Sequence, residues 1–106
     1  MELPKQVKVG GLIYEILAQP DLMRETDHIG TTKHANLLVT VDATVPLQVQ
    51  QSTLLHELLH CISNVYLNPD NLTEEQAYHL EGGLFQVLRD NSEVTAFILG
   101  GMNGSQ

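Results

Sequence analysis

The segment 52–64, STLLHELLHCISN, constrains the fold more than any other part of this chain. Its apolar residues recur at the three- and four-residue spacing of an amphipathic helix. His56, Glu57 and His60 interrupt that apolar run. Because a buried polar group without a partner costs about 1–3 kcal/mol, the helix needs a compensating interaction at these positions. We therefore expect a long helix whose polar residues form a site together.

The spacing of these three residues indicates metal chemistry. Residues i and i+4 of a helix project from one face, so His56 and His60 can direct imidazole nitrogens at a single ion. Glu57 lies about 100° around the helix, where it can accept a proton from water instead of binding the metal. This HExxH pattern predicts Zn²⁺ as the cofactor, His56 and His60 as ligands, and Glu57 as the general base.

Two histidines leave a zinc ion one protein ligand short. Metzincins continue with Gly and His three and six residues later, but Ser63 and Tyr66 stand there, which excludes that class. An acidic residue of the following helix is the remaining option. We expect Glu75, because it projects away from that helix's apolar stripe and could face the histidines. The alternatives are Glu74, His79 and Glu81.

The rest of the chain predicts a small α+β domain. Gly10-Gly11 lies between two alternating segments, which favours two antiparallel strands over residues 6–17. The polar segment that follows is expected to be a connecting loop with a short helix at 21–25, and NLLVTVD a third strand. We thus expect about three antiparallel strands packed on the two helices.

Helix signals mark the second half of the chain. Pro46, with Thr44 as a possible cap, favours a helix from about 46 to Leu67. The sequence TEEQ at 73–76 is a capping box that should start a second helix, ending near Asp90. Its Gly82-Gly83 pair suggests that another element approaches closely. A short helix at 93–99 would complete a single domain over 1–99, with 100–106 as a disordered tail.

Composition limits the possible partners. Thirteen acidic and five basic residues give a formal charge of −8, which disfavours nucleic acid and anionic membranes. No apolar run approaches the roughly 20 residues of a membrane-spanning helix. The lone Cys61 cannot form an internal disulfide, and the first residues lack a secretory pattern. We expect a cytoplasmic protein without nucleic-acid or membrane partners, and we expect Cys61 to be a buried small apolar residue.

Other polar residues give weaker signals. His28 and His34 lie in or beside the polar loop and are expected at the solvated surface, with a role in a cleft as the alternative. Tyr66 and Tyr78 are expected to pack in the core or an interface, with oxyanion stabilisation as the alternative.

With HELLH, the TEEQ-led helix and the preceding strand, the chain resembles small HExxH-plus-glutamate metallopeptidases. The most similar are the phage and mobile-element group related to ImmA/IrrE-type peptidases, and the minigluzincins. The resemblance is strongest over residues 50–92, in TLLHELLHCIS and LTEEQAYHLEGGLFQVLRDN. It implies a zincin-like domain in which His56, His60 and Glu75 bind zinc, Glu57 is the base, and Leu37–Val41 forms the sheet edge beside the cleft.

That resemblance also implies a function. It suggests a zinc-dependent hydrolase that cleaves peptide bonds, encoded by a phage and acting on a phage or host regulatory protein in the bacterial cytoplasm. The alternative is a catalytically silent, zinc-stabilised protein-binding module. The sequence gives no indication of the oligomeric state.

Overall fold

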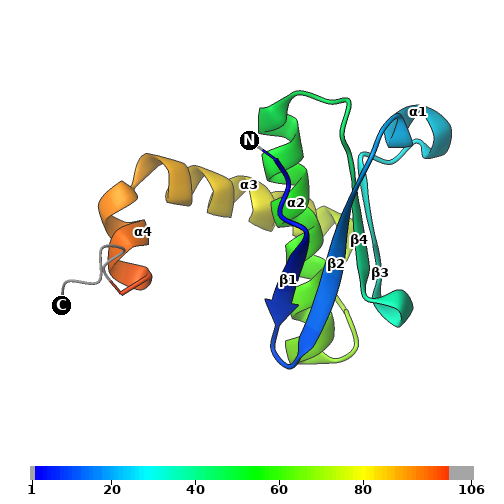
Figure 1. Ribbon diagram of the computed structural model, residues 1–106. Helices are drawn as coiled ribbons and strands as arrows, with labels where there is room; N and C mark the ends of the chain where they lie inside the picture. The colour runs from blue at the N-terminus through cyan, green and yellow to red at the C-terminus, as the bar shows by residue number, and fades with distance from the viewer. Residues whose placement is uncertain (1, 101–106) are drawn as a thin grey trace.

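A computed structural model describes residues 2–100 and shows a four-stranded sheet with one long helix packed on it (Figure 1). The expected tail therefore lies, apart from Gly100, outside the described residues. The elements are β1 (Gln6–Val9), β2 (Leu12–Gln19), α1 (Leu22–Thr26), β3 (Gly30–Lys33), β4 (Leu38–Asp42), α2 (Leu47–Ile62), α3 (Glu74–Asp90) and α4 (Ser92–Ile98). A short 3₁₀ turn, His34–Asn36, precedes β4, and a π-helical turn, Ser63–Leu67, extends α2.

The predicted hairpin at the N-terminal end is confirmed. Strands β1 and β2 pair antiparallel, with Val9 opposite Leu12. Gly10 takes a φ of 60°, a left-handed conformation that glycine adopts without strain. A Cβ at Gly10 would also lie 2.6 Å from a methyl group of Val65. Both observations require glycine at this turn.

The prediction of three antiparallel strands is wrong in number and direction. The sheet order is β1-β2-β4-β3, and β2 pairs parallel to β4. Strand β3 was missed because its sequence, GTTK, carries no apolar alternation and is typical of a loop. Strand β4 is flanked on both sides, and the edge strand is β3 rather than Leu37–Val41.

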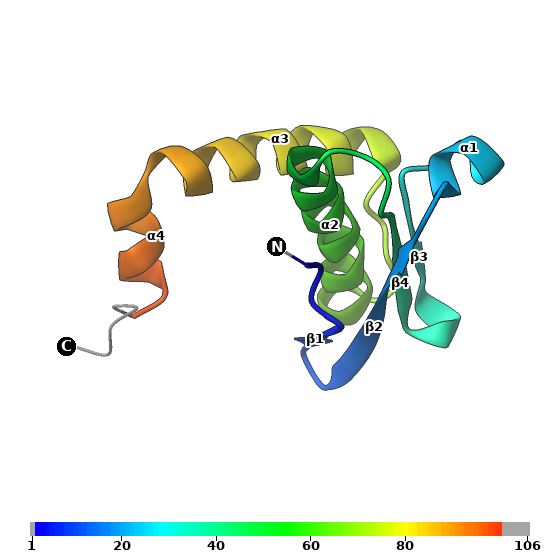
Figure 2. The same ribbon diagram turned by 45° about the horizontal axis from the view of Figure 1, so that its top comes forward.

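The core lies between the sheet and α2. Tyr14, Val39 and Val41 are fully buried there, and Cys61 of α2 joins them as the small apolar residue that was expected. No helix covers the middle of the opposite sheet face in the part of the chain that the structure describes (Figure 2). Ile13 and Leu17 of β2 are exposed on that side.

The two predicted long helices are present, with differences at their ends. The capping box is confirmed: Thr73 accepts from the Gln76 amide, and the Gln76 side chain accepts from the Thr73 amide, both at 3.0 Å. Helix α2 begins after Pro46, and the Thr44 hydroxyl does not cap it but donates to Asp42 at 2.6 Å.

The distal half of α3 leaves the body of the domain, and α4 turns back from its end (Figures 1 and 2). The expectation of a close neighbour at Gly82-Gly83 is wrong, because a Cβ at either position would meet nothing within 4 Å. Among the described residues, no helix is both long and apolar enough to cross a membrane.

Candidate metal centre

A cavity of about 840 Å³ opens between α2, α3 and β3. Polar residues of all three elements line it, and they include both motif histidines. The cavity therefore brings together polar side chains from segments that are distant in the sequence. The residues used below are His34, His56, Glu57, His60, Asp70 and Glu74.

Three of these side chains converge on one point. The Nε2 atoms of His56 and His60 lie 3.0 and 3.3 Å from Oε1 of Glu74. Ligand atoms from all three residues lie within 4.8 Å of one another. Among residues 2–100, His56, His60 and Glu74 form the cluster of potential ligands whose residue types and spacing suit a metal ion. The histidine pair predicted from the sequence is thus brought together with an acid of α3.

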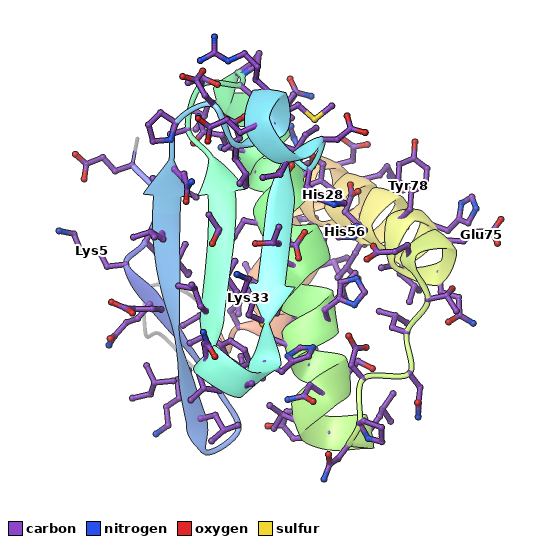
Figure 3. All side chains as sticks on the ribbon, turned by 90° about the vertical axis from the view of Figure 1, so that its right-hand side faces the viewer. Lys5, His28, Lys33, His56, Glu75 and Tyr78 are labelled. Atoms are coloured by element: carbon purple, nitrogen blue, oxygen red, sulfur yellow. The ribbon has the colours of Figure 1, made fainter. Side chains whose placement is uncertain are left out.

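The acid in this cluster is Glu74 and not Glu75, which was the residue chosen from the sequence. Helix α3 packs against α2 near Ala77, which is fully buried, and Glu74 lies one turn before Ala77 on nearly the same side. Glu75 is rotated by a further 100° or so. Its side chain points away from His56 (Figure 3). The choice of Glu75 assumed that the apolar stripe packs into the core while Glu75 faces α2, whereas Ala77, the first residue of that stripe, itself packs against α2.

The donor set fits a zinc ion. Imidazole nitrogen and carboxylate oxygen bind Zn²⁺ at about 2.0–2.2 Å in tetrahedral geometry, which places neighbouring ligand atoms about 3.3–3.5 Å apart. The two separations from Glu74, 3.0 and 3.3 Å, are close to that edge length. The His56 contact also lowers the pKa of Glu74. Glu74 is therefore held as the carboxylate that a metal requires.

Asp70, which no sequence pattern singled out, orients His60. Its Oδ2 lies 2.8 Å from Nδ1 of His60, which leaves Nε2 directed at the cluster. The same oxygen lies 3.2 Å from Nε2 of His34. A carboxylate on the far nitrogen of a metal-binding histidine fixes the ring orientation and the tautomer. The loop that ends α2 therefore supplies part of the site.

The hydrogen-bonded chain continues into the core. Nδ1 of His34 lies 3.0 Å from the hydroxyl of the fully buried Tyr14, which also accepts from Asn64 at 3.2 Å. His34 was expected at the surface, but it takes the alternative role in the cavity. No sequence signal identified Asp70, because it belongs neither to the motif nor to a helical period, and His34 was considered for a cleft only as an alternative.

Glu57 lies beside the histidines and is held by β3. Its Oε1 accepts a 2.6 Å hydrogen bond from the Thr32 hydroxyl. A Cβ on Gly30 would approach Glu57 Oε2 to 3.0 Å, so the glycine makes room for this carboxylate. Burial raises the pKa of Glu57, although the Thr32 hydrogen bond and the two imidazoles oppose that effect. Glu57 is thus a buried carboxylate with a raised pKa beside the two imidazoles.

The remaining candidate residues divide between the cavity and other places. His28, Tyr78 and Glu81 line the cavity, whereas Tyr66 is an exposed residue of the π-helical turn and does not line it. His79 stacks edge-on against Tyr78 and is not part of the three-residue cluster. Burial raises the pKa of Cys61 to about 12, so its thiol stays protonated. Thiolate ligation by Cys61 is therefore disfavoured.

Comparisons with protein-family models, with curated proteins and with solved structures found no match to this chain.

Proposed function

We propose that this protein is a zinc-dependent metallopeptidase with a small zincin-like domain. The observation that carries the proposal is the convergence of His56, His60 and Glu74 at a cavity that also contains Glu57. This set of two imidazoles, one carboxylate ligand and one adjacent carboxylate base is the one used by zinc hydrolases that keep a coordination position for water. The resemblance of residues 50–92 to HExxH peptidases gives the reaction class.

Each residue has a separate role in this proposal. Zinc, when bound, would act as a Lewis acid and lower the pKa of water. His56, His60 and Glu74 would hold the ion, and Asp70 fixes the orientation of His60. Glu57 takes the proton from the attacking water and delivers it to the leaving amine. Burial raises the pKa of Glu57 above its ordinary value, which is the direction that makes a carboxylate a stronger base.

Strand β3 provides a site for an extended substrate. It is the sheet edge, and Gly30, Thr31 and Thr32 line the cavity next to Glu57. An unpaired strand edge can bind a peptide through main-chain hydrogen bonds. A peptide bound there would place a scissile carbonyl near the histidine cluster. We propose an extended segment of a phage or host regulatory protein as the natural substrate, and cytoplasm as the location.

The test is replacement of Glu57 by Gln, with Glu75→Gln as a control that removes one carboxylate of the same type outside the cluster. Zinc content is measured on the purified proteins, and cleavage of an unbiased peptide mixture is followed by mass spectrometry. We expect Glu57→Gln to keep its zinc and to lose at least about 100-fold in cleavage rate. Glu75→Gln should retain both.

Two results would contradict the proposal. An unchanged rate in Glu57→Gln would remove its assigned role. Stoichiometric zinc without any cleavage by the unaltered protein would favour the alternative, a catalytically silent binding module whose metal joins α2 to α3.

A further inference from the structure

The C-terminal helices carry apolar side chains that the described part of the chain leaves exposed. On α3, an apolar stripe continues beyond the buried Ala77 at the helical spacing i+3, i+7, i+10 and i+11. On α4, Phe97 is 85% exposed, and its apolar neighbours are also open to solvent. These residues are Leu80, Leu84, Val87, Leu88, Val94, Phe97 and Ile98, and we call them the hook patch.

The shape of this region explains why the patch is open. Helix α3 crosses α2 near Ala77 and then extends past the body of the domain. In Figure 2, α2 and α4 lie on the same side of α3. The apolar stripe lies on that same side, because Ala77 belongs to it and packs on α2. The stripe therefore faces the inside of a hook made by α3 and α4.

The hook is held in a defined shape. The Thr95 hydroxyl of α4 donates to the Leu88 carbonyl of α3 at 3.2 Å, and the Asn91 side chain donates to the Val87 carbonyl at 3.0 Å. A helical segment of this length is marginal in water unless its apolar face is packed. The open apolar face of the hook is therefore available to a partner.

We propose that the partner is a second copy of this chain, and that two hooks interlock about a twofold axis. A standard interface removes about 800 Å² from each partner, which an apolar surface of this extent can supply. Two helices from each copy would form a small four-helix core.

The distribution of charge favours a like partner at this surface. The whole chain carries −8, but residues 82–99 contain only Arg89, Asp90 and Glu93, a net charge of −1. Two copies that approach through their hooks therefore meet at the least charged part of an acidic protein. A basic protein partner would gain more at the acidic surface elsewhere. This proposal does not depend on the metal centre.

The test is sedimentation velocity on the full chain between about 1 and 100 µM, a range that resolves a Kd near 10 µM. The hook variant is Leu84→Glu with Phe97→Glu. The control is Ile13→Glu with Leu17→Glu, which adds the same charge at residues that are 50% and 47% exposed on the open sheet face. We expect the unaltered protein and the control to sediment as dimers. The hook variant should be monomeric, with a Kd raised at least about 100-fold.

Far-UV circular dichroism shows whether each variant keeps its helices. If the hook variant loses them, Phe97→Ala with Ile98→Ala removes apolar surface without adding charge and should also weaken the dimer. The proposal is overturned if the unaltered protein is a monomer over the whole range, or if it forms assemblies that grow beyond two. A dimer that persists in the hook variant, or one that the control also abolishes, overturns it as well.

Discussion

A single step along α3 decides which acid faces His56 and His60. Glu74 and Glu75 are adjacent, equally acidic and both in the first turn of α3, where either carboxylate complements the helix dipole. They differ only in direction, because successive side chains point about 100° apart around the helix axis. Ala77 packs against α2 and fixes that rotation, so Glu74 faces the imidazoles and Glu75 faces solvent.

Zinc affinity should distinguish the two glutamates. We expect Glu74→Gln to bind zinc at least about 100-fold more weakly, because loss of a direct ligand should cost more than loss of an outer partner, which typically costs 10- to 100-fold. Glu75→Gln, with the same loss of charge, should bind like the unaltered protein. Competition with a chromophoric chelator measures both affinities. Weakened binding in Glu75→Gln with normal binding in Glu74→Gln would reverse this assignment.

The sequence predicted the site residues that lie close together along the chain. It could not predict the site residues that only the fold brings together. The i, i+4 spacing of His56 and His60 is fixed by helix geometry, so the amino-acid sequence alone is enough to predict their pairing. Asp70 meets both His60 and His34 only because a loop and a strand end pack beside α2. No periodicity in the sequence encodes that contact.

At the level of helices and strands, the sequence again predicted features that depend on neighbouring residues and did not predict how distant strands pair. The hairpin at Gly10-Gly11 and the capping box at Thr73 depend on neighbouring residues alone, and both are confirmed. The parallel pairing of β2 with β4 and the position of β3 at the edge depend on contacts between distant segments. Strand β3 is stabilised by pairing and by its contact with α2, which its four-residue sequence does not reveal.

Glycine substitutions should show how closely β3 approaches α2. A Cβ at Gly30 would lie 2.6 Å from a Thr53 methyl and 3.2 Å from Cγ of Glu57. We expect Gly30→Ala to lower the free energy of unfolding by about 1–3 kcal/mol, because α2 and β3 must separate. Gly82→Ala, in open space on α3, should raise it by about 0.5–1 kcal/mol through helix propensity.

Urea unfolding measures both glycine variants under identical conditions. A Gly30→Ala variant as stable as the unaltered protein would mean that β3 and α2 can accommodate a methyl group between them. In that case, the packing described for Glu57 would need revision.

At the scale of the whole molecule, the site joins parts that are otherwise weakly connected. Helix α2 is packed on the sheet, whereas α3 touches the body mainly through its contact with α2. His56 and His60 belong to the first helix and Glu74 to the second, and Asp70 lies in the loop between them. A metal bound by this set would therefore tie the outer helix to the core.

Zinc should consequently stabilise the folded chain. A ligand that binds only the folded state adds about 2.7 kcal/mol at 100 times its Kd. For a domain of this size, each kcal/mol shifts the midpoint of thermal unfolding by about 4–8 °C, so we expect a rise of at least about 10 °C. Calorimetry with zinc and then with excess chelator, at one fixed protein concentration, measures the shift. The His56→Ala variant should show little change, and an equal rise in that variant would place the stabilising metal elsewhere.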